Sequence, residues 1–156
     1  RRPREESTPP PSPGETVSRT IVADTGAIVA LVDRRDKHHL SLRRLFERDP
    51  GAWLLPWAIL PEVDYLLATQ LGARAAEAFL SDLAEGRFAV EWGSERDLRR
   101  ANEIHTRHRA LKLGLVDTSV LAVAERLKAD AIATLDYRHF DAVELAHRPR
   151  LVPRDG

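Results

Sequence analysis

The sequence predicts an α/β fold with a mainly parallel central sheet. Short apolar segments that suit buried strands alternate with longer segments whose apolar residues recur at helical spacing. Strands and helices that alternate in this way form parallel sheets covered by helices on both faces. A length of 156 residues suffices for one domain with a hydrophobic core but not for two ordinary ones. We therefore expect a single α/β domain.

The first strand is expected at residues 21–24, and it passes directly into an apolar helix over residues 25–32. A second helix follows over residues 38–48, and the sequence Asp49-Pro50-Gly51 ends it because Pro and Gly interrupt helices. Asp24 thus stands at the C-terminal end of a strand and beside a helix N-terminus. Open α/β proteins place their chemistry at this kind of position.

The middle of the chain predicts two more strands and three helices. Residues 52–55 form the second predicted strand, and Pro61 is acceptable in the following helix only within the first turn. That helix carries Glu62. Ser94 and Asp97 resemble a capping box, with Asp in place of Glu, at the start of a later helix. The expected elements after residue 55 are a helix to about Leu71, a helix over 73–84, a strand over 88–92 and a helix from 95 to about 110.

The C-terminal part predicts a sixth helix over residues 116–128 and a fourth strand over residues 131–134, directly before Asp136. Residues 143–145 could add an edge strand. Residues 1–18 are rich in Pro, Ser, Thr, Glu and Arg and cannot bury enough apolar area to order themselves, so we expect a flexible tail there. The expected organisation is a tail over 1–18, one domain over 19–150 and a C-terminal tail over 151–156.

Composition narrows the possible chemistry. The formal net charge is zero, which argues against nucleic-acid binding through a global positive field. The absence of Cys excludes disulfides and thiolate metal sites and agrees with a reducing compartment. No apolar run approaches the roughly 18 residues of a membrane span, and we expect a cytoplasmic protein with no membrane partner. The sequence also lacks a glycine-rich phosphate loop and a nucleophile elbow.

Four acids occupy comparable positions in the predicted fold. Asp24 and Asp136 follow predicted strands, so a parallel sheet brings both to the same edge. Asp117 lies in the apolar sector of the sixth helix, where a carboxylate needs a specific reason. Glu62 lies early in its helix, but periodicity leaves Asp64 an equal candidate. Taken singly, each acid also fits an ordinary role as a helix cap, a turn residue or a first-turn acid.

Carboxylates that crowd together repel one another unless their pKa values rise or a divalent cation binds them. Oxygen ligands without Cys favour Mg²⁺ or Mn²⁺ over zinc. Such ions orient a water and neutralise charge on a transferring phosphoryl group, which indicates a phosphodiester substrate. The residues Asp24-Thr25-Gly26-Ala27 also match the aspartic-protease triplet, but that class needs an all-β chain, and six predicted helices oppose it.

Histidines offer weaker metal candidates. His38 and His39 follow Asp36 closely enough to suggest a metal site, but we interpret them as the partly exposed first turn of the second helix. His105 and His108 lie on the apolar side of the fifth helix, and we interpret them as packed core histidines.

With the four acids placed, the chain resembles the PIN-domain family and, within it, the VapC-type toxin ribonucleases of bacterial toxin–antitoxin pairs. The matching segments, in the family's order, are 22–27, 36–39, 61–63, 115–119, and 133–136 leading to His139-Phe140. They cover about residues 20 to 145. The resemblance implies a three-layer α/β/α PIN-like nuclease domain over residues 19–150.

The resemblance implies a Mg²⁺-dependent endoribonuclease for which Mn²⁺ is a possible substitute. The four residues that it assigns to the catalytic cluster are Asp24, Glu62, Asp117 and Asp136. Asp24 and Asp117 would be the direct metal ligands. Asp136 could act through water or through a second layer of contacts, with Thr134 assisting by a hydrogen bond. Arginines near the pocket, such as Arg34, Arg35 or those among residues 96–109, would hold backbone phosphates.

The resemblance also favours Glu62 over Asp64 and implies three partners. These are an RNA substrate, whether tRNA, rRNA or mRNA, a cognate VapB-type antitoxin, and a second copy of the chain in a homodimer. Apolar residues of the third and fourth helices could supply the protein surfaces or simply pack within the domain: Tyr65, Leu66, Leu67, Leu71, Phe79 and Leu80. Two alternatives remain open, a non-catalytic PIN-like module that binds RNA or protein, and a nuclease that cleaves DNA.

Overall fold

The computed structural model describes residues 19–156, whose strands form one five-stranded sheet in the order β3-β2-β1-β4-β5. Every neighbouring pair is parallel. The strands are β1 Ile21–Ala23, β2 Trp53–Pro56, β3 Ala89–Glu91, β4 Ala131–Ala133 and β5 Arg150–Val152. Central β1 is flanked on both sides, with Val22 beside Leu54 of β2 and Ile132 of β4. The predicted parallel α/β sheet is confirmed.

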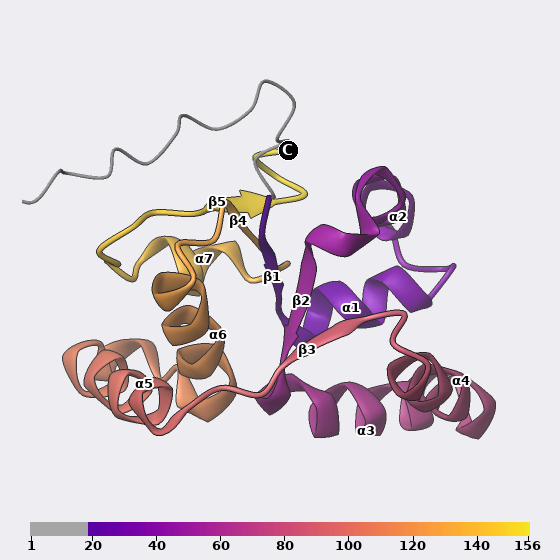
Figure 1. Ribbon diagram of the computed structural model, residues 1–156, viewed down its shortest axis with the longest axis horizontal. Helices are drawn as coiled ribbons and strands as arrows, with labels where there is room; N and C mark the ends of the chain where they lie inside the picture. The colour runs from indigo at the N-terminus through magenta and orange to yellow at the C-terminus, as the bar shows by residue number, and fades with distance from the viewer. Residues whose placement is uncertain (1–18) are drawn as a thin grey trace, which may run out of the picture.

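Helices cover both faces of this sheet, which confirms the three-layer α/β/α architecture. They are α1 Thr25–Val32, α2 His39–Arg48, α3 Leu60–Gln70, α4 Ala73–Ala84, α5 Glu95–Arg107, α6 Gly114–Arg126 and α7 Tyr137–Asp141. Figure 1 shows α5 and α6 on one side of the sheet and α1, α2 and α4 on the other. Among the helices of residues 19–156, none combines the length and the apolar character that a transmembrane segment needs.

Local signals in the sequence account for several helix starts. Asp24 caps α1, and its side chain accepts a hydrogen bond from the backbone of Thr25. Ser94 and Asp97 form the expected capping box at the start of α5. Pro61 lies in the first turn of α3, where its missing N–H costs no helical hydrogen bond. The starts of α1 and α3 place Asp24 and Glu62 beyond the C-terminal ends of β1 and β2, at the same edge of the sheet.

The C-terminal part of the fold differs from the expectation. The edge strand is Arg150–Val152 and not residues 143–145, because Leu151 and Val152 pair with β4 and are buried there. The sheet therefore extends past residue 150, where we expected the domain to end. The short helix α7, which Asp136 caps, was not expected. The expected tail over residues 1–18 lies outside the described residues.

Candidate active site

Asp24 is held rigidly at the C-terminal end of β1. Its carboxylate is 6% exposed and accepts two hydrogen bonds, from the backbone N–H of Thr25 at 2.8 Å and from the hydroxyl of Thr134 at 2.9 Å. Burial raises the pKa of Asp24, and these two hydrogen bonds oppose the rise. The negative charges of Glu62 and Asp136 raise it as well.

Thr134 connects the ends of two neighbouring strands. It follows β4, is fully buried, and donates its hydroxyl to Asp24 Oδ2 while accepting the backbone N–H of Asp136 at 3.1 Å. The backbone N–H of Asp24 also donates to the carbonyl of Ala133 at 2.8 Å. Asp24 and Asp136 thus lie at the same sheet edge, as the strand pattern predicted.

Asp117 lies in the first turn of α6, half-buried, and its side chain accepts no hydrogen bond from residues 19–156. The cap of α6 is Leu113, so helix capping does not explain this acid. The pKa of Asp117 is raised to about 7, and burial is the largest cause. The negative charges that add to this rise belong to Asp24, Asp136 and Glu62, while His139 opposes it. All four predicted acids therefore act on one electrostatic site.

Glu62 and its rival Asp64 point to different surroundings. Glu62 lies exposed in the first turn of α3, and its charge raises the pKa of both Asp24 and Asp117. Asp64 lines a separate apolar hollow beside Leu80. The geometry brings Glu62 to the acidic site and leaves Asp64 outside it.

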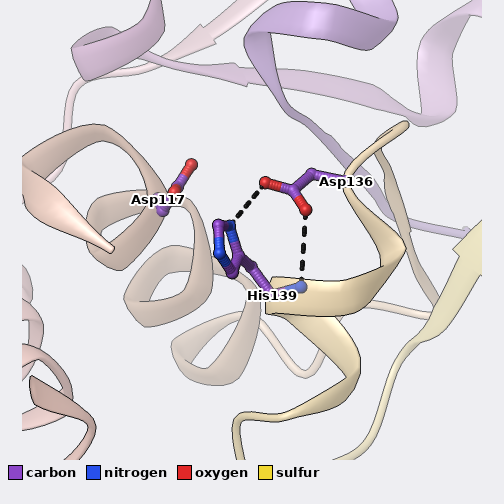
Figure 2. Close-up of side chains that lie close together, drawn as sticks. All are labelled: Asp117, Asp136 and His139. Atoms are coloured by element: carbon purple, nitrogen blue, oxygen red, sulfur yellow. Dashed lines mark hydrogen bonds and ion pairs between the residues drawn. The ribbon is translucent and has the colours of Figure 1, made fainter. Parts of the chain in front are cut away.

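His139 joins the site, although sequence reasoning did not select it. Asp117, Asp136 and His139 each offer one possible metal-ligand atom, and these atoms all lie within 4.8 Å of one another (Figure 2). His139 Nδ1 lies 2.8 Å from Asp136 Oδ2, and its backbone N–H donates to Asp136 Oδ1 at 3.4 Å. Asp24 is not part of this group of three. The sequence does contain one indication of this role: His139 lies three residues after Asp136, and in a helix that begins at an acid this spacing brings the two side chains together.

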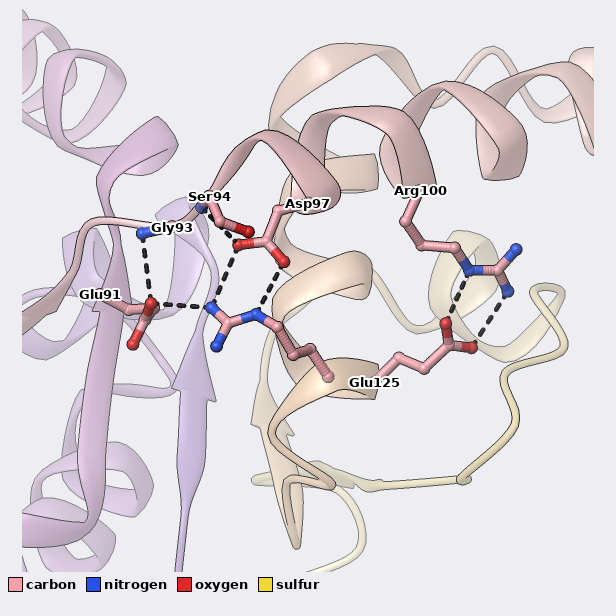
Figure 3. A network of polar contacts seen from close by, with 7 residues as sticks. Glu91, Gly93, Ser94, Asp97, Arg100 and Glu125 are labelled. Carbon is pink, nitrogen blue, oxygen red and sulfur yellow. Dashed lines mark hydrogen bonds and ion pairs between the residues drawn. The ribbon is translucent and has the colours of Figure 1, made fainter.

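The acidic site carries negative charge that no nearby cationic residue neutralises. Within residues 19–156, no Lys or Arg forms an ion pair with any of the four acids, and His139 is the basic group that contacts them. Two arginines of α5 and α6 are already paired with other acids: Arg126 binds Asp97 and Glu91, and Arg100 binds Glu125 (Figure 3). An unneutralised cluster of oxygen donors suits a divalent cation.

Two of the arginines expected to hold phosphate have other surroundings in the structure. Arg100 is held by Glu125 at 2.6 Å, and Arg34 lines a different hollow together with Arg43 and Phe46. Neither side chain is placed with the four acids.

The four histidines that the sequence analysis considered, His38, His39, His105 and His108, do not belong to the acidic site. His39 is 8% exposed, with Nδ1 3.1 Å from the carbonyl of Ala30, and the backbone of His38 donates to Asp36. This turn explains their spacing without a metal. The interpretation of His105 as a packed core residue was wrong, because its side chain is exposed although Ala101 and Ile104 on the same side of α5 are buried. His108 is half-buried, with Nδ1 3.0 Å from the carbonyl of Ile104.

The apolar residues of α3 and α4 divide between core and surface. Leu67 and Phe79 are buried, whereas Tyr65 and Leu80 are 67% and 63% exposed. Trp92, after β3, is 74% exposed. A hollow of about 490 Å³ lies between α3, α4 and β3, and the residues that line it are Leu60, Pro61, Asp64, Phe79, Leu80, Leu83, Ala84, Val90 and Trp92. We call it the α3–α4 hollow.

Comparisons with known proteins match almost the whole described chain. The model of the PIN domain family matches residues 21–145. Ribonuclease VapC26 of Mycobacterium tuberculosis is 28% identical over 123 residues, which are 79% of this chain and 91% of that protein. The crystal structure of M. tuberculosis VapC20, described as a Sarcin-Ricin loop cleaving toxin, has a TM-score of 0.71 and 25% identity and covers 83% of this chain and 100% of its own. DNA-bound VapBC from Salmonella typhimurium shares the fold, with a TM-score of 0.67 and 15% identity over 85% of this chain and 96% of that one.

Proposed function

Because the chain belongs to the PIN domain family, we propose that it is a Mg²⁺-dependent endoribonuclease, with Mn²⁺ as a substitute, and the toxin of a toxin–antitoxin pair. The observation that carries this proposal is the convergence of four acids: the negative charges of Asp24, Asp136 and Glu62 all raise the pKa of Asp117. Its similarity to ribonuclease VapC26 supports RNA as the substrate.

The residues of the site fit a divalent cation, since they offer carboxylate oxygens and an imidazole without a competing Lys or Arg. A bound cation would polarise a water and neutralise charge on the phosphodiester. We assign Asp24 and Asp117 as its ligands. Asp24 is suited to this because two hydrogen bonds fix its orientation before any ion arrives.

The two remaining acids have different surroundings and therefore different proposed roles. Glu62 is solvent-exposed beside Asp24 and Asp117, where it can accept a proton from the attacking water. Asp136 caps α7 and contacts His139, so it supports the site from the side of β4. Asp24, Glu62 and Asp117, which follow β1 or lie in the first turns of α3 and α6, would hold the cation and its water.

The proposed partners follow from the surface and from the relatives. The exposed Leu80 and Trp92 of the α3–α4 hollow would receive a VapB-type antitoxin, in keeping with the VapBC complexes that share this fold. Leu98 and Leu115 are 48% and 56% exposed and would support a homodimer. We place the protein in the cytoplasm, where an RNA-cleaving toxin meets tRNA, mRNA and ribosomes.

The test is cleavage of tRNA, of mRNA and of ribosomes by the full chain with Mg²⁺, with Mn²⁺ and with EDTA. We expect cleavage of at least one RNA that needs the cation and is lost in Asp24→Asn. Asp64→Asn is the matched control, because this acid faces the α3–α4 hollow. An Asp24→Asn protein as active as the parent would refute the mechanism.

A non-catalytic module predicts a different result. Such a protein would bind RNA or a partner but show no cation-dependent cleavage, and Mn²⁺ would neither bind nor shift its thermal unfolding. Cleavage of DNA in place of RNA under the same conditions would indicate the third alternative. Calorimetric titration with Mn²⁺ and a parallel DNA substrate therefore separate the three functions.

A further inference from the structure

We propose that His139 is a nitrogen ligand of the bound cation, which makes this site prefer first-row transition-metal cations to Mg²⁺. The proposal rests on the proposed function, since it needs a cation at the acidic site. It adds a ligand that neither the strand pattern nor the family resemblance supplied, and it predicts which ions the site selects.

The distances within the group of three suit one ion. Donor atoms around an octahedral cation with bonds of about 2.1 Å lie roughly 3 Å apart when adjacent and roughly 4.2 Å apart when opposite. One possible ligand atom from each of Asp117, Asp136 and His139 falls within 4.8 Å of the other two. The 2.8 Å contact between His139 Nδ1 and Asp136 Oδ2 orients the ring, and Nε2 is the nitrogen that would face the cation. Small side-chain rotations would bring the set onto a single centre.

The local backbone keeps the imidazole in place. The N–H of His139 donates to Asp136 Oδ1, so the first turn of α7 fixes the two side chains relative to each other. Asp117 approaches from α6, a different element. The group therefore spans two elements that the fold positions independently, and Figure 2 shows the ring between the two carboxylates.

The imidazole also has a nitrogen available. Nε2 of His139 has no hydrogen-bond partner among residues 19–156, while Nδ1 contacts Asp136. A neutral imidazole that donates from Nδ1 to a carboxylate keeps a lone pair on Nε2, which is the usual state of a metal-ligating His.

Orientation of Asp136 is the competing role for His139. It explains the contact between these two residues but not the proximity of Asp117 to both. Ligation explains all three. Because Mg²⁺ favours oxygen donors, and affinity at mixed N/O sites rises from Mn²⁺ to Co²⁺, an imidazole ligand changes ion selectivity, whereas an orienting imidazole does not.

The test uses the full, tag-free chain with Mg²⁺, Mn²⁺ or Co²⁺ in calorimetric titrations. In His139→Asn, the amide replaces Nδ1 and can still donate to Asp136, but Nε2 is absent. We expect this variant to lose about tenfold or more in affinity for Mn²⁺ and Co²⁺ and much less for Mg²⁺. His105→Asn, at an exposed position on α5, should change none of the affinities.

Pulsed electron paramagnetic resonance of the Mn²⁺-loaded protein gives the direct measurement. We expect a ¹⁴N hyperfine coupling from a directly bound nitrogen in the parent and in His105→Asn, and its loss in His139→Asn. The parent spectrum decides the matter even if the variant folds poorly. If the parent shows no such coupling, or if His139→Asn keeps the parent's ratio of Mn²⁺ to Mg²⁺ affinity, then His139 only orients Asp136.

These outcomes are distinct from failure of the proposed function. A parent that binds cations and cleaves RNA without a nitrogen coupling would overturn the role of His139 alone. A parent that binds none of the three cations would overturn both proposals.

Discussion

Replacing Asp117 by Asn should stabilise the metal-free protein at high pH while it abolishes RNA cleavage. The pKa of Asp117 rises from 3.8 to about 7 in the folded protein, mainly through burial. A rise of this size corresponds to at most roughly 4 kcal/mol by which the charged carboxylate destabilises the folded protein. The side chain accepts no hydrogen bond within residues 19–156, so the substitution breaks none there.

The sign of the effect depends on pH in a defined way. Between 3.8 and about 7 the folded state binds a proton more tightly than the unfolded state, so the stability of the parent falls as pH rises through this range. Below the range the penalty is absent, and above it the penalty is complete. The advantage of Asp117→Asn should therefore be small near pH 4 and reach its maximum above pH 7.

Urea unfolding in EDTA at pH 4.5 and pH 8 measures this difference. Asp64→Asn serves as the control, since Asp64 is exposed and lies outside the acidic site. Added Mn²⁺ should stabilise the parent and leave Asp117→Asn little changed. If the stability difference between Asp117→Asn and the parent is the same at both pH values, the acidic site does not carry the repulsion described here.

Three further predictions concern the surroundings of the site. Thr134→Val should lower the free energy of unfolding by about 1–3 kcal/mol and reduce cleavage about 10- to 100-fold, because the carboxylate of Asp24 loses a buried hydrogen-bond donor. Thr134→Ser keeps the hydroxyl and should retain both stability and cleavage. Urea unfolding and the cleavage assay measure the two effects. Arg126→Gln should lower the unfolding free energy by about 1–3 kcal/mol, because Asp97 would lose its partner while buried; Arg99→Gln, in an exposed pair, should cost less than about 0.5 kcal/mol. Calorimetry should show that the affinity for Mn²⁺ rises with pH up to about 7 and then levels off, because Asp117 must lose its proton before it can bind the cation. An affinity that does not change between pH 5 and pH 7 would contradict this expectation.

The sequence predicted the long elements well because each carries its own local signal. The helix expected over residues 73–84 has those bounds in the structure, and Ser94 with Asp97 forms the capping box that was expected. Two short elements near the C-terminus, α7 and β5, were missed. The five residues of α7 are too few to show a helical period, and β5 is a three-residue strand that forms only by pairing with β4.

The candidate site divides in the same way. Asp24 and Asp136 were predicted to share an edge because all parallel strands end on one side. The place of His139 depends on α7, and its approach to Asp117 depends on how α6 packs against the sheet, so neither was available from periodicity. His105 shows the opposite error, since the apolar stripe of α5 is buried at Ala101 and Ile104 but His105 beside it stays exposed.

The hydroxyl of Thr134 connects the carboxylate of Asp24 to the backbone amide of Asp136, so the NMR signal of that amide can report on the state of Asp24. A threonine has a single hydroxyl proton, and here it goes to Asp24 while the same oxygen receives the N–H of Asp136. When a proton or a cation occupies Asp24, the carboxylate becomes a weaker acceptor, and the hydroxyl oxygen in turn accepts less strongly. The ¹⁵N and ¹H shifts of the Asp136 amide should then follow the occupancy of a side chain 112 positions earlier in the chain.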